Sequence, residues 1–299
     1  MTPYELTPSL AAYVDASATF QAKDESLQSR REAFASACRY FTPPAPANVT
    51  FFDDAVDNLA VRIYSPIGEA PADGWPTLLY LHGGGWNMGS HTTHDWFAFA
   101  LLKRLQVAIV AVDYRLAPEH PFPAPLEDAL TVWRALRDGK WPTLSRERLV
   151  VAGDSAGGTI AAGLCVALRD FSLEQPLLQV LVNPVLTDSD QLPSMQQHAH
   201  PPKLTTEGLR TSLQGYVPAP SHKSHPHALP LKLQDLSGLA PAFIGVAQYD
   251  PLCDQGRAYA ALLQDAGIQV KISEARSYRG TRRSSFTYRE SEDEGPQPA

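Results

Sequence analysis

Apolar runs of three to six residues alternate with amphipathic stretches through the middle of the chain. Short strands that are apolar throughout and alternate with helices are typical of a parallel sheet covered on both faces. The runs predict strands at 77–81, 107–112, 149–152, 177–182, 242–247 and 270–272. The amphipathic stretches predict helices at 96–105, 126–136, 157–168 and 256–263. A hairpin at 49–52 and 59–64 comes before them, so we expect an α/β fold with a mostly parallel central sheet and helices on both faces.

Three regions depart from this alternation. Residues 1–45 look helical and amphipathic and end at a proline cluster, which predicts a separate N-terminal segment before a main domain of residues 46–280. Residues 187–238 are rich in His, Pro, Ser and Gln and only weakly periodic, as expected of an excursion over the sheet. Residues 281–299 contain three hydrophobic residues against seven charged ones, so we expect a disordered polar tail.

Composition and charge narrow the class of protein. The chain has 299 residues, 44% hydrophobic and 19% charged, which is typical of a folded globular protein. A net charge of −7 argues against a general nucleic-acid binder or a binder of anionic membranes. We see no signal peptide and no apolar run long enough to span a membrane. The three cysteines, Cys38, Cys165 and Cys253, are odd in number and far apart, and we therefore expect a cytoplasmic protein without disulfides.

The sequence Gly-Asp-Ser-Ala-Gly at residues 153–157 carries the strongest chemical signal. A serine at the tip of a sharp strand-to-helix turn sits in a strained backbone conformation, and the flanking glycines let helix and strand approach closely. The bare pattern arises by chance in about one in ten chains of this length. Here an apolar strand run precedes it and a helix rich in small residues follows. We expect Ser155 to be a nucleophile; the alternative is a glycine-rich turn with an incidental serine.

A glycine run follows the predicted strand at 77–81. In His82-Gly83-Gly84-Gly85-Trp86, the backbone N–H groups of Gly83 and Gly84 are expected to be free to donate to an anionic oxygen. With the N–H of Ala156 they would form a three-donor oxyanion hole. The alternatives are a flexible turn or a phosphate loop, and the latter fails for lack of a Gly-Lys-Ser/Thr ending. We expect His82 to shape the loop by hydrogen bonding rather than to transfer protons.

Four motifs in order resemble one family. The segments at 82–86, 113–124 (Asp-Tyr-Arg-Leu-Ala-Pro-Glu-His-Pro-Phe-Pro-Ala), 153–158 and 250–254 (Asp-Pro-Leu-Cys-Asp) are similar to those of the bacterial hormone-sensitive-lipase family of esterases. The resemblance covers roughly residues 1–280. It implies an α/β-hydrolase fold, serine carboxylesterase activity on short-chain acyl esters, and a helical cap over the site. Residues 1–45 and 187–238 match the two pieces of that cap, and no cofactor or metal is implied.

Asp250 is the candidate third group of the site. It follows the predicted strand at 242–247, and the carboxyl ends of parallel strands place ligand-facing groups. The resemblance implies that Asp250 orients and charge-stabilises a catalytic histidine, and that Asp254 is a secondary loop residue. The alternative is that Asp250 only caps the following helix.

The histidine that should complete the site is missing from its expected place. The resemblance puts it about three residues after Tyr278-Arg279-Gly280, where this chain has Thr281-Arg282-Arg283, and the last histidine of the sequence is His227. Arginine cannot act as the base because its guanidinium stays protonated. Family-like sequence stops abruptly at Gly280, and our hypothesis is a change of reading frame there. Sequencing the gene tests it, since another frame must then encode a histidine within a few codons.

Competing interpretations remain at this stage. The histidines at 198, 200, 222, 225 and 227 could suggest a metal site, but they lack Cys or carboxylate partners at ligand spacing, and solvated loop residues are expected. The leading function is an impaired carboxylesterase acting on a small-molecule ester. The rivals are a non-catalytic small-molecule binder, as in plant gibberellin receptors that resemble this family, and an amidase or peptidase. The resemblance also implies a homodimer through the last strand, which the altered C-terminus makes doubtful.

Overall fold

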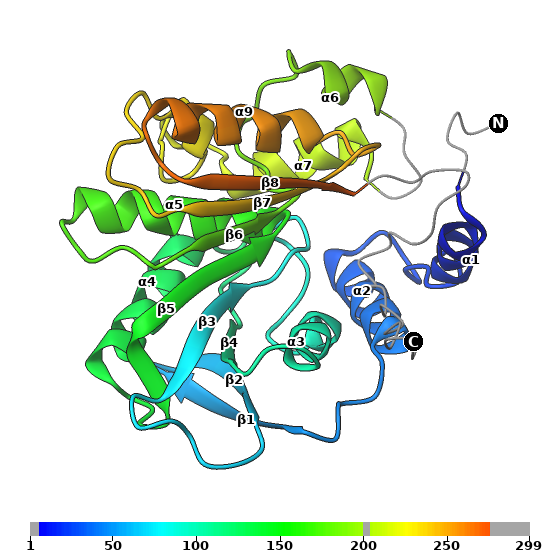
Figure 1. Cartoon of the computed structure of the whole chain (residues 1–299). Coiled ribbons are helices and arrows are strands. Elements are labelled where there is room, and N and C mark those ends of the chain that lie inside the picture. Colours follow the sequence, from blue (N-terminus) through cyan, green and yellow to red (C-terminus); the bar gives the residue numbers. More distant parts are fainter. Residues whose placement is uncertain (1–5, 200–203, 276–299) are drawn as a thin grey trace, which may run out of the picture.

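The computed structural model describes residues 6–199 and 204–275 as one α/β fold built on a central sheet (Figure 1). Its strands are β1 (Val49–Val56), β2 (Leu59–Pro66), β3 (Trp75–Leu81), β4 (Ala108–Val112), β5 (Leu144–Asp154), β6 (Gln179–Val182), β7 (Ala242–Ala247) and β8 (Val270–Ala275). Its main helices are α1 (Pro8–Ser17), α2 (Leu27–Phe41), α3 (Asp95–Leu102), α4 (Ala124–Asp138), α5 (Ala156–Asp170), α7 (Thr206–Tyr216) and α9 (Cys253–Asp265). Shorter helical turns are α6 (Pro193–Gln197), α8 (Pro220–Lys223) and the 3-10 turn η1 (Pro230–Lys232).

The strand order confirms the predicted sheet. In the described part of the chain the order is β1-β2-β4-β3-β5-β6-β7-β8. The pairs β1–β2 and β2–β4 are antiparallel, and every pair from β4 to β8 is parallel. The parallel strands therefore end at the same edge of the sheet, and loops following β3, β5 and β7 are brought together there.

Helices cover the sheet from two sides, as the apolar strands require. Figure 1 shows α3 on one side and α4, α5 and α9 on the other. Alternate residues of β3 divide between these layers: Leu79 and Leu81 join the large core cluster with α4, α5 and α9, while Tyr80 joins the smaller cluster with α3. All three side chains are almost fully buried. The period of two along β3 thus fixes which residues can reach each face.

The N-terminal segment differs from the single helical stretch expected from its pattern. It forms two helices, α1 and α2, separated at residues 18–26. The second helix begins after Ser26 because the Ser26 hydroxyl accepts the Ser29 N–H (3.1 Å), an N-cap interaction. It ends at Phe41, just before Thr42 and two prolines. Figure 1 shows both helices beyond the edge of the sheet toward which β7 and β8 point.

The region between β6 and β7, called the insertion below, is more regular than its sequence indicates. It contains α6, α7, α8 and η1, of which only α7 exceeds two turns. The start of α7 is set by Thr205, whose hydroxyl accepts the Gly208 N–H (3.0 Å). The predicted polar tail at 281–299 lies outside the described residues. Within the described ranges, no helix is both long and apolar enough to cross a membrane.

Candidate active site

Ser155 occupies the turn between β5 and α5, called the serine elbow (residues 153–158) below. Its backbone angles, φ 52° and ψ −118°, lie where residues with a Cβ are strained. Backbone hydrogen bonds hold the turn: the Ser155 N–H donates to Val182 O on β6 (2.8 Å), and Ser155 O accepts the N–H groups of Thr159 (3.2 Å) and Val185 (3.4 Å). The predicted serine thus stands on a strained turn at the carboxyl edge of the sheet.

The glycines of the elbow are required by close backbone contacts. A Cβ placed on Gly153 would lie 2.2 Å from Gly157 O, and one placed on Gly157 would lie 1.9 Å from Leu81 O. Neither position can hold a side chain without moving the backbone. Because Leu81 ends β3, the second contact also shows that the elbow packs directly against the segment that follows β3.

That segment, residues 82–89, is called the glycine loop below, and its donors differ in part from those expected. The Gly83 N–H is not free: it donates to the Asp154 carboxylate (Oδ1, 2.9 Å). The expectation of a free donor at Gly83 was therefore wrong, because a side chain distant in sequence reaches it. The N–H groups of Gly84, Gly85 and Ala156 make no hydrogen bond to any other residue within 6–199 and 204–275.

His82 lies at the base of the glycine loop, in the surroundings expected of a loop-shaping residue. Its Nδ1 is 2.8 Å from Gly83 O, and its ring stacks on Tyr114 with centroids 4.2 Å apart. The Tyr114 hydroxyl donates to His82 O (2.7 Å). Burial, with the neighbouring His94, lowers the pKa of His82 to about 4. His82 is therefore neutral near pH 7 and is held by the Tyr114 stack, the Nδ1 hydrogen bond and the hydrogen bond to its backbone carbonyl.

Asp154, the residue before Ser155, is a carboxylate within the elbow itself. Its Oδ1 accepts hydrogen bonds from the Tyr80 hydroxyl (2.6 Å) and the Gly83 N–H (2.9 Å), and its Oδ2 lies 3.7 Å from His94 Nε2. Burial raises the pKa of Asp154, opposed by these hydrogen bonds. No role was expected for Asp154 from the sequence. A charged residue at the buried end of an apolar strand was the signal that could have singled it out.

Asp250 follows β7 in the turn before α9. Its carboxylate accepts the Leu252 N–H (Oδ1, 2.8 Å), an Asx turn that precedes the helix; the N-cap of α9 is Leu252, so Asp250 is not the capping residue. Burial raises the pKa of Asp250 to about 6, and the Leu252 hydrogen bond opposes the rise only in part. In the described part of the chain, no Lys, Arg or His forms an ion pair with Asp250. The carboxylate is therefore partly buried, and no cation among the described residues balances its charge.

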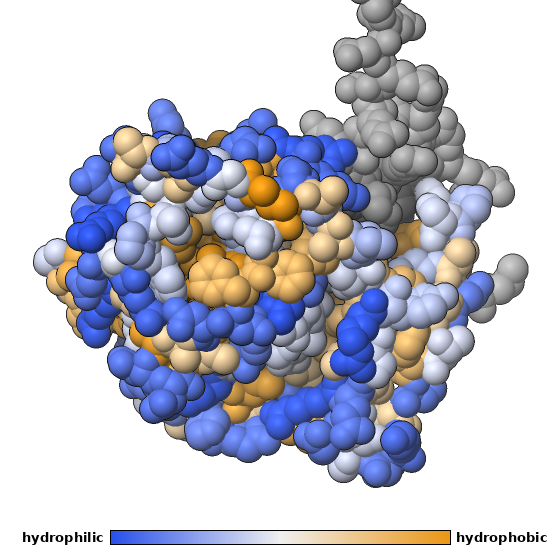
Figure 2. All heavy atoms as spheres, turned by 90° about the horizontal axis from the view of Figure 1, so that it is seen from below, coloured by the Kyte–Doolittle hydropathy of each residue, from blue (hydrophilic) through white to orange (hydrophobic). Residues whose placement is uncertain are grey.

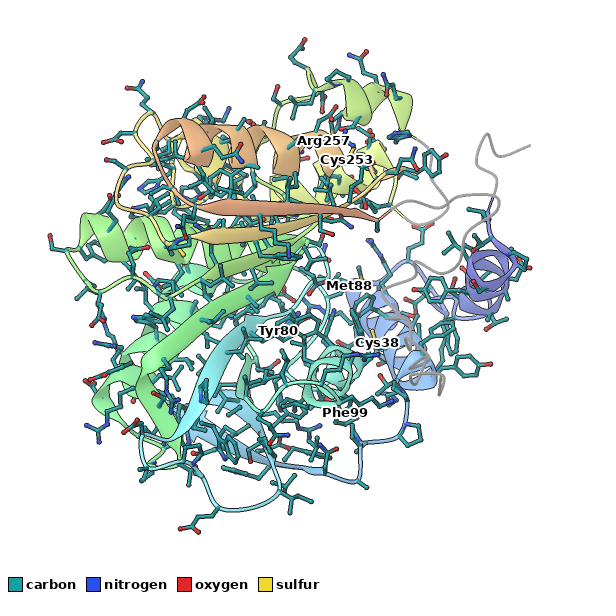
Figure 3. All side chains as sticks on the ribbon, in the orientation of Figure 1. Cys38, Tyr80, Met88, Phe99, Cys253 and Arg257 are labelled. Atoms are coloured by element: carbon teal, nitrogen blue, oxygen red, sulfur yellow. The ribbon has the colours of Figure 1, made fainter. Side chains whose placement is uncertain are left out.

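Asp254 connects the same turn to the insertion. It pairs with Arg257 (2.7 Å) and accepts the Ser194 N–H of α6 (2.9 Å), while the Ser194 hydroxyl donates to Pro251 O (2.7 Å). These contacts tie α6 to the turn that carries Asp250. Figure 3 shows Cys253 and Arg257 at the start of α9, beside this junction.

The N-terminal helix α2 is anchored to the glycine loop by Arg31. Its guanidinium makes a bidentate ion pair with Glu119 (2.8 Å for each bond) and donates to Asn87 O (2.7 Å) and Ala117 O (3.2 Å). About two turns further along α2 lies Cys38, labelled in Figure 3, whose pKa is raised to about 12 by burial and by the charge of Asp154. This helix therefore lies over the elbow region, a connection that the sequence did not reveal.

The insertion reaches the glycine loop through α7. The Tyr216 ring stacks on Trp86 with centroids 4.5 Å apart and planes 2° from parallel. A Cβ placed on Gly85 would lie 2.9 Å from the Ser212 hydroxyl, so α7 passes close to the backbone of the loop. The residues that the sequence assigned to two separate cap segments thus contact the same loop.

The histidines lie elsewhere. Among the described residues, no hydrogen bond joins a histidine to Ser155 or Asp250. His227 Nε2 lies 2.7 Å from Asp170 Oδ2, and the rings of His225 and His227 have their centroids 4.7 Å apart. No group of three or more His, Cys, Asp or Glu within 6–199 and 204–275 has the arrangement of a metal site. The expected position of the histidine after Gly280 lies outside the described residues.

Comparison with known proteins gives a consistent result. A family model described as the α/β-hydrolase fold matches residues 78–278. The carboxylesterase NlhH of Mycobacterium tuberculosis is 40% identical over 230 residues, covering 74% of this chain and 70% of that protein. The ethyl acetate hydrolase of Pseudomonas putida is 39% identical over 217 residues, covering 72% of this chain and 68% of that protein.

Solved structures agree over a longer span. An esterase from the bacterial hormone-sensitive lipase family has a TM-score of 0.81 and 26% identity, covering 92% of this chain and 90% of that one. An ester hydrolase from the metagenome of Lake Arreo, solved with a bipyridine phosphonate derivative, has a TM-score of 0.81 and 34% identity, covering 91% and 90%.

Proposed function

The chain belongs to the α/β-hydrolase family, as a bacterial hormone-sensitive-lipase-like carboxylesterase, and from this premise we propose that Ser155 hydrolyses short-chain acyl esters through an acyl-enzyme. The observation that carries the proposal is the strained Ser155 on the elbow, packed against a loop with free backbone N–H groups. The name of the ethyl acetate hydrolase supports a short acyl group.

We assign the oxyanion donors from their hydrogen-bonding state. The N–H groups of Gly84 and Ala156 are the donors expected from the sequence. The third donor is the N–H of Gly85 in place of that of Gly83, which is hydrogen-bonded to Asp154. In this assignment Ser155 Oγ attacks the ester carbonyl, and the three N–H groups stabilise the oxygen as it becomes negative. Loss of one such donor typically lowers kcat by about 10²–10³-fold.

Asp250 is assigned the role of orienting an imidazolium, and that partner is what the chain lacks. The partly buried carboxylate with its raised pKa suits a site that would hold a cation when complete. No histidine follows His227 in the sequence, so proton transfer from Ser155 has no base of the expected kind. Oxyanion stabilisation and binding alone still give roughly 10³–10⁴-fold catalysis over water in related triad enzymes. We therefore propose weak hydrolysis by this chain.

The test combines an acyl-length series with replacement of the missing base. Hydrolysis of p-nitrophenyl acetate, butyrate and octanoate is measured with increasing imidazole, and Ser155→Ala under the same conditions gives the background that imidazole produces alone. We expect a slow Ser155-dependent rate that rises with imidazole and is highest on the shorter esters. Equal rates for the two proteins at every imidazole concentration would refute the proposal. A fast rate without imidazole would show that another base exists, and p-nitroacetanilide in parallel tests the amidase alternative.

A non-catalytic binder is the second candidate, favoured by one observation. The elbow and the glycine loop keep their close fit although the histidine is missing. Binding without turnover would then remain possible. A small acyl ester that raises the Tm of the protein and is recovered unhydrolysed, with Ser155→Ala responding equally, would support this candidate over the first.

A further inference from the structure

Asp154 joins two segments that the proposed reaction needs in fixed relation. It is the last residue of β5, immediately before Ser155, and its Oδ1 accepts the N–H of Gly83 in the loop after β3. The two strands are direct neighbours, with Leu81 opposite Gly153. One carboxylate oxygen therefore bridges the serine elbow and the glycine loop at the point where both leave the sheet.

Tyr80 holds the Asp154 carboxylate from the α3 side of the sheet. The Tyr80 hydroxyl donates to the same Oδ1 (2.6 Å), and its ring stacks on Phe97 of α3 with centroids 4.2 Å apart and planes 11° from parallel. Tyr80 is 1% exposed, so its ring is held by packing on the α3 side of the sheet. The carboxylate thus has one donor from a rigid strand and one from the loop, which fixes the position of the loop relative to the strand.

The glycine loop lies so close to the Asp154 carboxylate at Gly83 that it has no room to shift toward Asp154. A Cβ placed on Gly83 would lie 2.2 Å from Asp154 Oδ2, and a Cβ placed on Gly157 would lie 1.9 Å from Leu81 O. In the described residues no Lys or Arg pairs with Asp154; its other contact is His94 at 3.7 Å. The Asp154 carboxylate is largely buried and has no strong cation beside it, so ion pairing does not explain why it lies there. Burying a charge is unfavourable unless hydrogen bonds offset the cost.

We propose that Asp154 is a positioning residue, which clamps the glycine loop onto the serine elbow so that the N–H groups of Gly84 and Gly85 stay aligned with that of Ala156. This inference rests on the proposed function, because the alignment matters only if an oxyanion forms at Ser155. Asp154 acts through the backbone of Gly83 and does not touch the substrate.

The central variants separate hydrogen bonding from charge. Asp154→Asn keeps an Oδ1 that can accept both hydrogen bonds, so the Ser155-dependent kcat in imidazole is expected to stay within about threefold of the wild type. Asp154→Ala removes the acceptor, and we expect kcat to fall about 10–100-fold with KM changed less than threefold, a loss below that of deleting an oxyanion donor outright. Tyr80→Phe leaves the Gly83 bond and is expected to reduce kcat about 3–10-fold.

Tyr64→Phe is the matched control. The Tyr64 hydroxyl donates to Asp95 (2.5 Å), a tyrosine–aspartate bond on the same side of the sheet that contacts neither the elbow nor the glycine loop. We expect Tyr64→Phe to lower Tm as Tyr80→Phe does while leaving kcat unchanged. The inference is overturned if the two tyrosine variants lose kcat equally. It is also overturned if Asp154→Ala has the same kcat as Asp154→Asn.

Hydrogen exchange keeps the inference testable if the proposed function fails. Should wild type and Ser155→Ala hydrolyse esters equally, the proposed reaction is wrong, and the clamp is judged by amide exchange in the peptide containing residues 82–89. We expect this peptide to exchange at least tenfold faster in Asp154→Ala than in Asp154→Asn, with peptides of β7 and β8 unchanged. Equal exchange in the two variants overturns the clamp itself.

Discussion

Replacing Asp250 by Asn tests how the partly buried carboxylate affects the free energy of unfolding. Burial raises the pKa of Asp250 to about 6 from an ordinary value of 3.8, so the folded protein holds this proton more tightly than the unfolded chain does. A gap of about two pH units corresponds to roughly 3 kcal/mol. By linkage, the wild type loses this stability as the pH rises from about 4 through 6, and the loss is complete above that range.

An Asn side chain keeps the oxygen that accepts the Leu252 N–H but cannot ionise. We therefore expect Asp250→Asn to match the wild type near pH 4 and to exceed it by about 2–3 kcal/mol at pH 8. For a chain of this size that is a rise in Tm of roughly 3–5 °C. Thermal unfolding followed by circular dichroism at several pH values measures the difference.

The control lies in the same turn and has the opposite sign. The pKa of Asp254 is lowered, because its hydrogen bonds to Arg257 and Ser194 outweigh the opposing effect of burial. Asp254→Asn is therefore expected to be less stable than the wild type from pH 8 down to about pH 4, and the difference should shrink only as the pH falls below about 4. A stability difference for Asp250→Asn that does not vary with pH, or a loss of stability at pH 8, would refute the reasoning about burial.

Three further predictions concern the elbow and the helix over it. Ser155→Gly should be more stable than Ser155→Ala by about 1 kcal/mol in urea unfolding, since glycine relieves the strain at φ 52° and alanine does not; equal midpoints would contradict this. Gly157→Ala should lose about 3 kcal/mol or more, because its Cβ would meet Leu81 O at 1.9 Å, whereas Gly215→Ala in α7, with its nearest neighbour at 3.9 Å, should be neutral or stabilising. Cys38 should react with iodoacetamide at pH 8 about 10²–10³-fold more slowly than a free thiol, because its pKa of about 12 leaves little thiolate, and labelling at the free-thiol rate would contradict the burial of this side chain.

The elbow could be predicted from the sequence because its geometry depends on local spacing. Gly153 and Gly157 are required by contacts within a few residues of each other and with the strand beside them. The strands of the sheet could be predicted for a similar reason, since a run buried on both faces must be apolar along its whole length. Only the lengths differed, as in β5, which begins at Leu144 rather than at 149.

The hydrogen bond made by the Gly83 N–H could not be predicted, because its acceptor, Asp154, lies 71 residues away in sequence. The same holds for Arg31, whose acceptors lie 56 to 88 positions further along the chain. In the insertion, α7 contacts the glycine loop through the stack between Tyr216 and Trp86, two residues that are 130 positions apart in sequence. Such contacts are decided by tertiary packing, which a single sequence does not reveal. The roles of Ser155 and Asp250 in catalysis stay predictions.

The anchoring of α2 by Arg31 also has a consequence for the order in which the protein is made. Synthesis proceeds from the N-terminus, so α2 emerges early and remains without its partners until Asn87, Ala117 and Glu119 follow. Once β6 has been added, the glycine loop, the elbow and Arg31 have all their mutual contacts, well before Asp250 is translated. The half of the site that would hold an oxyanion can therefore assemble on a nascent chain, and the half that would hold a proton carrier is completed last.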